Sequence, residues 1–546
     1  MENKVSVSVR IMRNRIFSIA LLCLFVLCAG IYNYGLHRSF WFDYEYAFPI
    51  YRIFLKEFYD INLNLSGIYE ILAYIPYKLF GCSLKALRVY AATIYQLIIL
   101  FCAIAAIYSF ERKKFEWYKL GIFAFIAVIL HPGSSPFCGH YSTNFHRYPY
   151  DMHTAPIIAA TFSVMLLCLH QGMTKRKYKN ILKVIILAVI VLGYKMSDFL
   201  YIIGFVGPLV CVGLIYLWRE KRKLFFALAF GVIAVLALLH VISFVVPSLE
   251  LLFDYIPIDG YGAWVDGSTV YGNNGFADLR EIWSYISNTT VELLALFNID
   301  IFGKSMLSIG TLIAGFRLIL VIFMFVCCFK IVIDAIRKKD EYQSLDPINI
   351  VLALGIIFNF FVVMLSDYGD EPRCIRYMTL ILFYGAIFFA RQSESIIVKM
   401  HGEIDNRSKM YFFLFFSFAI ITNMTTFWKE DDYVADYEPA ISNVNYYIKT
   451  NNLGNGIGGR GIASTLTVVG DGDYAVVDSY VTNEGFQLNI GEFDKVPETF
   501  YYIIDWPRYD GGFFDAETIY QYLGEPDAVY EVDGFIIYYY REGFSW

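Results

Sequence analysis

Two carboxylates stand one residue apart in an aromatic segment that directly follows the first long apolar run of the chain. The segment, residues 40–49, reads Phe-Trp-Phe-Asp-Tyr-Glu-Tyr-Ala-Phe-Pro, and its acids are Asp43 and Glu45. Ionisable groups at a hydrophobic boundary are costly to desolvate, and in membrane proteins they tend to mark functional sites. The ordinary alternative is a pair of solvated acids at a helix end, which the surrounding interfacial aromatics disfavour. A carboxylate in this place can accept a proton from a substrate hydroxyl or hold a metal ion.

Three arginines near the ends of later apolar runs are candidates for binding a phosphate group. Arg147 lies just before the run 154–172, and Arg373 and Arg376 lie in the short polar segment 367–376. A guanidinium presents a planar fork of donors that matches phosphate oxygens. The alternative for Arg373 and Arg376 is an ion pair with acids of the same segment, because buried ions need partners.

Four further residues are secondary candidates. Lys195 and Asp198 flank a tight turn between two apolar runs, where they can also satisfy one another, and Asp151 and His153 lie in the loop 133–153. The three histidines of that loop lack the spacing of standard metal ligands, so no metal site is predicted there.

These residues must be positioned by a membrane protein. The chain has 546 residues, of which 58% are hydrophobic and 18% aromatic, and its mean hydropathy is +0.50. Apolar runs of about 20 residues, the length that crosses a bilayer, recur throughout and predict about eleven spans. They are 16–36, 89–110, 119–132, 154–172, 181–195, 199–218, 224–247, 306–333, 348–366, 377–391 and 410–427.

Basic clusters occur in every second connection between these runs. The clusters are 112–114, 175–177, 219–223, 337–339 and 407–409. By the positive-inside rule they are cytoplasmic, which places the N-terminus inside and the C-terminal segment outside. The first outer loop, 37–88, is predicted to contain two amphipathic helices lying in the interface. In the outer segment 248–305, a weaker apolar piece at 291–302 is too short to span.

The last part of the chain, 430–546, is predicted to be a small soluble α/β domain. It has five Lys and Arg against 21 Asp and Glu, whereas the whole chain has 44 against 50, so charge changes sharply at this boundary. None of the ten cysteines follows Cys374, which argues against a disulfide framework and fits a bacterial surface.

Within this domain the sequence predicts individual elements. Alternating residues predict strands at 475–481 and 500–504, and Asp533-Gly534 between 529–532 and 535–540 predicts a hairpin. Asp515 is a candidate N-cap for a short helix ending at Gly524. The run 454–459 fits G-x-G-x-x-G, but a strand is expected to follow it at 462–469, so we interpret the run as a flexible connection and not as a dinucleotide site.

The arrangement as a whole resembles the GT-C superfamily of integral membrane glycosyltransferases, in particular the protein mannosyltransferase and aminoarabinose transferase branch. The resemblance rests on Asp-x-Glu at 43–45 after the first span, interfacial helices in 37–88, Arg147-Tyr148 and Arg376-Tyr377 at span entrances, and a soluble C-terminal domain. It covers nearly the whole chain. This chain has Asp-x-Glu where many members have Asp-Asp, Asp-x-Asp or Glu-x-Asp, and it lacks the proline that often follows the Arg-Tyr.

The resemblance implies a polytopic α-helical fold in 1–429, with a small extracytoplasmic α/β domain in 430–546. It also implies transfer of a sugar, with inversion, from a polyprenyl-phosphate donor to an extracytoplasmic glycan, lipid or protein. Asp43 would be the base and Glu45 would orient the acceptor or a divalent metal ion, although the two roles can be exchanged. Arg376, with Arg147 or Arg373, would hold the phosphate. Membrane lipids are expected partners, and nucleic acid is not.

Three other functions are compatible with parts of the sequence. An O-antigen-type polymerase or ligase also has many spans and outer arginines, but it would be expected to rely on a large late outer loop. A transporter or flippase predicts charges at mid-depth and inverted repeats, whereas the charges here gather at the ends of the runs. A structural or sensor role requires that all the acids be ordinary solvated residues.

Overall fold

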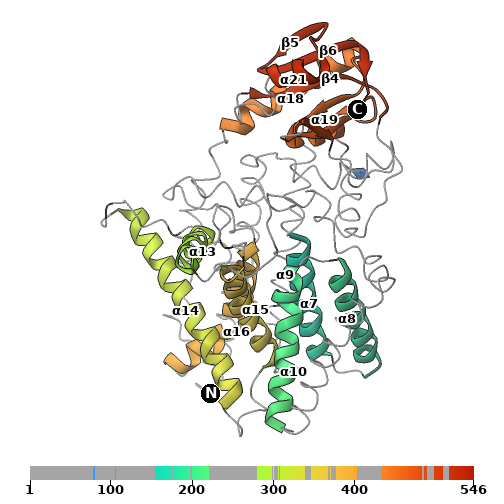
Figure 1. Ribbon diagram of the computed structural model, residues 1–546. Helices are drawn as coiled ribbons and strands as arrows, with labels where there is room; N and C mark the ends of the chain where they lie inside the picture. The colour runs from blue at the N-terminus through green and yellow to red at the C-terminus, as the bar shows by residue number, and fades with distance from the viewer. Residues whose placement is uncertain are drawn as a thin grey trace, which may run out of the picture.

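The structure is a computed structural model that divides into a group of helices and a mixed domain beyond one end of that group (Figure 1). The residues it describes are 78–79, 81, 105, 154–173, 176–196, 199–220, 280–297, 299, 305, 308–337, 346–366, 369, 377–401, 432–482, 485–488, 497–507 and 516–545. We call residues 432–545 the tail domain, and the end of the helices nearer to it the tail-side end.

Nine helical elements form the described part of the helix group. They are α7 (Thr154–Gly172), α8 (Arg176–Met196), α9 (Phe199–Tyr201), the π-helix η2 (Ile202–Val206), α10 (Gly207–Glu220), α13 (Ile282–Leu296), α14 (Ile309–Arg337), α15 (Pro347–Met364) and α16 (Thr379–His401). The predicted runs 154–172, 199–218, 306–333, 348–366 and 377–391 coincide with helices here, and 181–195 lies inside α8. Apart from Ala105, the runs 16–36, 89–110, 119–132, 224–247 and 410–427 lie outside the described residues.

Helix α15 is the centre of this group. It begins with Pro347 at its first position, after Asp346, whose carboxylate accepts a hydrogen bond of 3.0 Å from the Ile348 N–H. Its side chains are buried almost all round, as expected of a helix that is apolar on every side. It packs against α10, α13, α14, α16 and η2.

Helix α14 shows the opposite pattern, because most of its apolar surface is uncovered. Its exposed large side chains are Leu312, Ile319, Ile322, Phe323, Val326, Phe329, Ile333 and Ile336. So large an apolar surface is unusual on a soluble monomer and suits contact with lipid. Three described segments are long and apolar enough to cross a membrane: Ile202–Arg219, Ala314–Arg337 and Pro347–Met364.

The tail domain is built on a six-stranded mixed sheet of order β3-β2-β1-β4-β6-β5. The strands are β1 (Gly456–Gly458), β2 (Val476–Thr482), β3 (Gly485–Leu488), β4 (Phe500–Asp505), β5 (Ala528–Val532) and β6 (Phe535–Phe544), and the helices are α18 (Asp432–Asn451), α19 (Arg460–Gly470) and α21 (Ala516–Leu523). Strand β1 is parallel to both β2 and β4, whereas the pairs β2–β3, β4–β6 and β5–β6 are antiparallel.

Several predicted elements of the tail are confirmed. Strands β2 and β4 match 475–481 and 500–504, and α21 matches the short helix before Gly524. The turn between β5 and β6 has positive φ at both central residues, 48° at Asp533 and 84° at Gly534, as the tight hairpin requires.

Two predictions for the tail are wrong. The segment 462–469, predicted as a strand, lies in helix α19, where Ile462 and Leu466 lie four residues apart and are both buried. Its run of β-branched residues favours strands, but this propensity is weaker than the packing of an apolar helix face against β2. The glycine-rich run 454–459 is not a flexible connection, because it contains the central strand β1.

The glycines in and just before β1 are explained by the tyrosines of the neighbouring strand β4. A Cβ added to Gly456 would lie 2.1 Å from Cε2 of Tyr502, and one added to Gly454 would lie 2.8 Å from Cδ2 of Tyr501. The glycines therefore leave room for two aromatic rings.

Candidate functional site

Almost all the residues singled out from the sequence lie outside the described residues. These are Asp43, Glu45, Arg147, Asp151, His153, Asp198, Arg373 and Arg376. Lys195 is described by its backbone alone and lies in the last turn of α8, four residues before α9 begins at Phe199. The structure does describe the elements on either side of several of these residues, and they converge at the tail-side end.

The start of α16, which follows Arg376 directly, is fixed by a side chain of α15. Tyr377 and Met378 form a short 3₁₀ turn before the helix, and both are buried. The amide nitrogen of Asn359 donates a hydrogen bond of 2.9 Å to the Tyr377 carbonyl. Asn359 is fully buried, and its Oδ1 has no hydrogen-bond partner among the described residues. This amide sets where the backbone of α16 begins.

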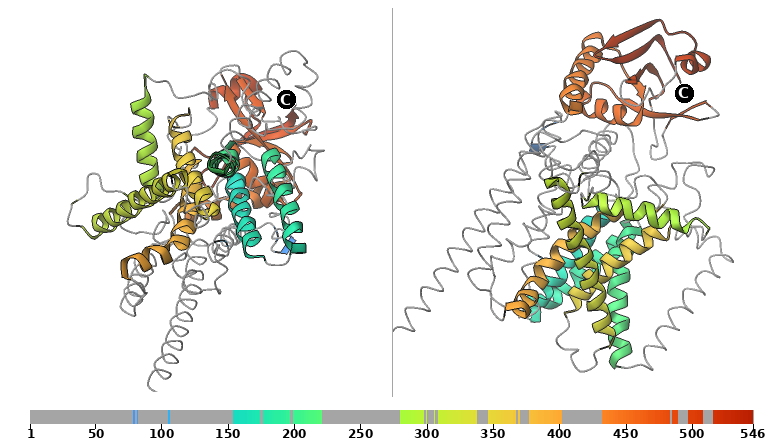
Figure 2. Two further views of the ribbon diagram at one scale, coloured as in Figure 1. Left: turned by 90° about the horizontal axis from the view of Figure 1, so that it is seen from below. Right: turned by 90° about the vertical axis from the view of Figure 1, so that its left-hand side faces the viewer.

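Helix α13 lies crosswise at the tail-side end, whereas α10 and α15 run along the group (Figures 1 and 2). Its buried residues are Tyr285, Thr289, Leu293 and Leu296. The face packs closely on the chain that follows α15, because a Cβ added to Gly369 would lie 3.0 Å from Thr289 Oγ1 and 3.1 Å from Tyr285 Cδ1. The Thr289 hydroxyl is fully buried and has no hydrogen-bond partner in the described part of the chain.

Glu292 lies on the same side of α13. It follows Tyr285 by seven residues and Thr289 by three, which places the three on one helix face. Its side chain is half-buried, and burial raises the pKa of its carboxyl to about 7. A carboxyl with that pKa is available near neutral pH both as a proton donor and as a proton acceptor.

Glycines in α15 and η2 allow α15 to approach η2 and α16 closely. A Cβ on Gly355 would lie 2.5 Å from Cε2 of Tyr384 and 2.7 Å from the Gly204 carbonyl oxygen. Tyr201, the residue directly before η2, shares a hydrogen bond of 3.0 Å with the Ser163 hydroxyl of α7. A π-helical turn inside a longer helix is uncommon and often accompanies a functional site.

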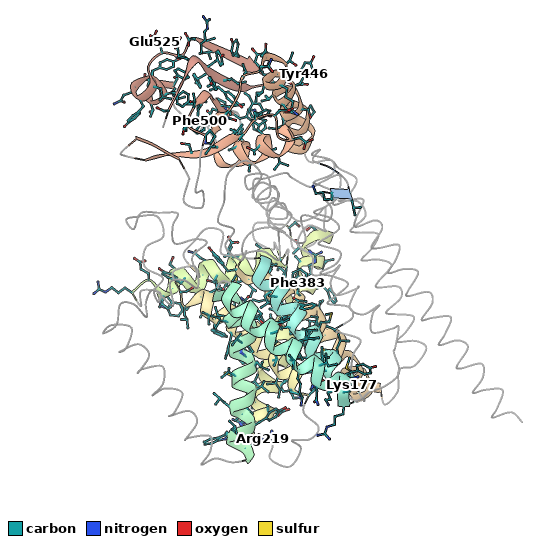
Figure 3. All side chains as sticks on the ribbon, turned by 90° about the vertical axis from the view of Figure 1, so that its right-hand side faces the viewer. Lys177, Arg219, Phe383, Tyr446, Phe500 and Glu525 are labelled. Atoms are coloured by element: carbon teal, nitrogen blue, oxygen red, sulfur yellow. The ribbon has the colours of Figure 1, made fainter. Side chains whose placement is uncertain are left out.

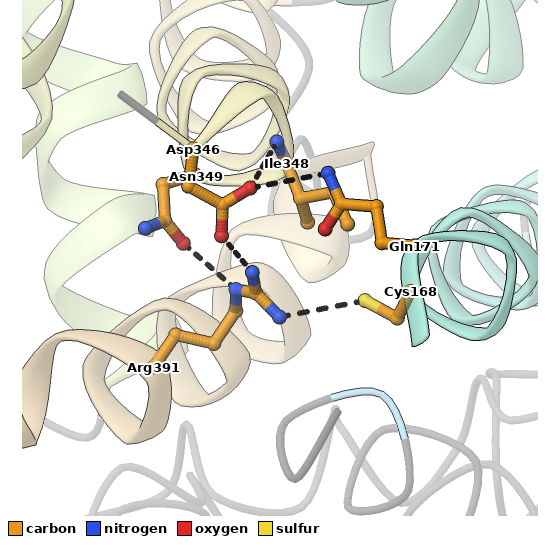
Figure 4. A network of polar contacts seen from close by, with 6 residues as sticks. All are labelled: Cys168, Gln171, Asp346, Ile348, Asn349 and Arg391. Atoms are coloured by element: carbon orange, nitrogen blue, oxygen red, sulfur yellow. Dashed lines mark hydrogen bonds and ion pairs between the residues drawn. The ribbon is translucent and has the colours of Figure 1, made fainter. Parts of the chain in front are cut away.

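A second polar cluster joins α7, α15 and α16 near the start of α15 (Figure 4). Arg391 forms an ion pair with Asp346, donates from Nε to Asn349 Oδ1 at 2.8 Å, and donates from Nη1 to Cys168 Sγ at 3.6 Å. Asp346 also accepts a bond from Gln171 Nε2 at 3.5 Å. Every nitrogen of the guanidinium has a partner, and its side chain is only 3% exposed. We call these residues the Arg391 cluster.

The Arg391 cluster lies at the end of the helices that is remote from the tail domain. Lys177 and Arg219 lie there too, whereas Phe383 lies nearer to the tail domain (Figure 3). Arg219 donates from Nη1 to the Ala335 carbonyl at 2.6 Å and so ties α10 to the last turns of α14.

Asn359, Glu292 and Arg391 were not singled out from the sequence. Each interrupts or borders an apolar run, and a polar residue within such a run is the signal that could have identified them. In the part of the chain that the structure describes, no group of three potential metal ligands occurs. Asp43 and Glu45 lie outside the described residues, so their proposed metal role stays a prediction.

No protein-family model matches the chain, and no curated protein sequence matches it.

Proposed function

We propose that this protein is a membrane glycosyltransferase that moves a sugar from a polyprenyl-phosphate donor to an acceptor at the tail-side face of the membrane. The observation that carries the proposal is the pair Asp43 and Glu45, which the sequence places among aromatics directly after its first apolar run. The donor class and the inverting reaction come from the resemblance to GT-C enzymes.

The distribution of charge supports this orientation of the reaction. Lys177 and Arg219 lie at the end remote from the tail domain, as expected if that end faces the cytoplasm (Figure 3). The acidic tail domain lies at the other end, where Asn359 is buried beside the start of α16 and Thr289 is buried on the crosswise helix α13. Arg376 immediately precedes that start.

The proposed chemistry is a direct displacement. The Asp43 carboxylate removes the proton from an acceptor hydroxyl as that oxygen forms a bond to the anomeric carbon. The bond between the anomeric carbon and the phosphate oxygen breaks, so the configuration inverts and polyprenyl phosphate leaves. Arg376, together with Arg147 or Arg373, stabilises the charge that grows on the leaving phosphate. Glu45 orients the acceptor or a divalent metal ion.

The test compares cells with and without the gene, with lipid-linked and surface glycans analysed by mass spectrometry. Deletion is expected to remove one sugar from a surface glycan, lipid or protein and to cause its polyprenyl-phosphoryl form to accumulate. Wild-type protein and the exposed-acid control Glu525→Gln should restore the glycan, whereas Asp43→Asn should not. Unchanged glycans after deletion would refute the proposal.

A flippase would give a similar loss of surface glycan, so the purified protein must separate the two functions. A transferase cleaves the donor and releases polyprenyl phosphate in detergent, where there is no membrane to cross. A flippase leaves the donor intact under these conditions.

A further inference from the structure

The buried face of α13 carries Thr289, and the half-buried Glu292 lies beside it on the same side of the helix. Thr289 is fully buried, and its hydroxyl lies against Gly369 without a hydrogen-bond partner among the described residues. Buried hydroxyls are normally paired, because an unpaired one has lost its water and gained nothing in return. An unpaired buried hydroxyl is therefore a place where a ligand can supply the missing bond.

Glu292 lies one turn further along the same face. The residues that flank Glu292 on the buried face are Thr289, Leu293 and Leu296. The other acid of this segment, Glu281 at the start of the helix, is exposed. Helix α15, which packs against α13, has no charged residue within its bounds, and Asp346, which precedes it, is paired with Arg391. Burial alone accounts for the raised pKa of Glu292.

A carboxyl that is partly protonated near neutral pH and a hydroxyl together offer both donors and acceptors. This combination suits the hydroxyl groups of a sugar, each of which can donate and accept. It does not suit the phosphate of the donor, because Glu292 repels phosphate whenever it is ionised.

We propose that Glu292 and Thr289 form a hydroxyl-binding subsite that holds the sugar ring of the donor at the tail-side end. The proposal rests on the proposed function, since it identifies the sugar as part of the same lipid-linked substrate. In this subsite Glu292 and Thr289 are specificity residues that hold the sugar, distinct from Asp43 and Glu45, to which we assign the chemistry. Helix α13 lies across the ends of the other helices, a position from which its inner face can reach a headgroup at the membrane surface (Figure 2).

The test measures binding of two lipids to the full-length protein in nanodiscs by native mass spectrometry. The probes are undecaprenyl phosphate and undecaprenyl-phosphoryl glucose, which differ only in the sugar. We expect the wild type to prefer the sugar-bearing lipid. Glu292→Leu and Thr289→Val should each weaken binding of that lipid by about three- to tenfold, the loss of one or two hydrogen bonds, without changing binding of undecaprenyl phosphate.

Matched controls lie on the same helix. Glu281→Gln and Thr290→Val change the same kinds of side chain at exposed positions, and they should leave both affinities unchanged. Glu292→Gln keeps hydrogen-bonding capacity and volume, so it should retain most of the preference for the sugar, even if Glu292→Leu folds poorly. Melting temperature, measured in parallel, identifies a merely structural role, which would lower stability and leave the preference intact.

The outcomes separate the two proposals. If the wild type binds neither lipid, the proposed function fails and the subsite fails with it. If the wild type prefers the sugar-bearing lipid and Glu292→Leu and Thr289→Val keep that preference, the subsite alone is refuted.

Discussion

The two polar clusters inside the helix group differ in how completely their hydrogen bonds are satisfied. In the Arg391 cluster, each guanidinium nitrogen has an acceptor and both oxygens of Asp346 are used. Only at its edge is an acceptor, Gln171 Oε1, left without a partner among the described residues. At the tail-side end, Asn359 and Thr289 are fully buried, yet each keeps an oxygen without a partner there.

This difference separates two uses of buried polarity. A cluster in which the hydrogen bonds are satisfied, such as the Arg391 cluster, holds three helices in one arrangement and requires no ligand to complete it. A cluster in which bonds are missing is less stable than it could be, and such sites are commonly completed by water or by a ligand. We therefore propose a structural role for the Arg391 cluster and a functional role for the tail-side end.

The largest expected effect concerns which end of the helix group faces the cytoplasm. Each reporter fusion that tests this orientation should be either fully active or inactive. A reporter that is active only outside the cytoplasm should be active when fused after Tyr44, Gly260 or Trp546, and inactive after Lys177 or Lys338, because basic connections stay inside. Activity after Lys177 would place the Arg391 cluster on the outer side and reverse the assignment.

The next effect concerns the stability of the Arg391 cluster. Asp346→Asn retains an oxygen to cap α15 but leaves Arg391 without its carboxylate, so it should destabilise the protein by about 3–5 kcal/mol. Adding Arg391→Met should recover much of this loss, since no unpaired charge then remains buried. Thermal unfolding in detergent measures both variants. Equal stability of Asp346→Asn and the wild type would show that the pair contributes nothing.

Replacement of Asn359 should affect activity more than stability. Asn359→Leu removes the bond to the Tyr377 carbonyl, at a cost of about 1 kcal/mol, but it also removes the unpartnered Oδ1, which offsets part of that cost. Because the start of α16 directly follows Arg376, donor turnover should fall, mainly in kcat if the arginine acts on the leaving phosphate. Normal kcat in a protein with lowered melting temperature would assign Asn359 to structure alone.

The smallest expected effect is a pH dependence of stability that originates at Glu292. Its folded-state pKa, about 7, lies above that of an unfolded glutamate, so the folded protein binds more protons between about pH 4.5 and 7. Stability should therefore fall as pH rises through this window. Glu292→Gln should flatten the curve of melting temperature against pH, whereas Glu281→Gln should not. Identical slopes in the wild type and Glu292→Gln would exclude a raised pKa.

The sequence was most informative where one local pattern decides the structure. The hairpin at Asp533-Gly534 and the strands β2 and β4 follow directly from turn chemistry and alternation. The apolar runs of α7 and α15 likewise mark their helices closely. Local propensity was insufficient where packing decides the structure. The segment of α19 is rich in β-branched residues but forms a helix, and Gly456 of β1 leaves room for the ring of Tyr502, which comes 46 residues later in the chain.

Long-range contacts explain why the polar clusters could not be predicted. Arg391 pairs with Asp346 across 45 residues and contacts Cys168 across 223, separations over which no sequence period operates. Asn359 could have been noticed as a lone amide in an apolar run, but its partner, a backbone carbonyl of α16, could not. The acids and arginines to which we assign the chemistry stay predictions from the sequence.

The central claim is that a sugar is transferred at the tail-side end with Asp43 as the base. The most direct measurement is release of polyprenyl phosphate from undecaprenyl-phosphoryl glucose and related donors by the purified protein, followed by mass spectrometry. We expect the wild type and Glu525→Gln to release the lipid phosphate in the presence of a suitable acceptor. Asp43→Asn, equally well folded, should be slower by at least about 100-fold, the usual contribution of a general base. Near-normal release by Asp43→Asn, with Glu45 intact, would contradict the account.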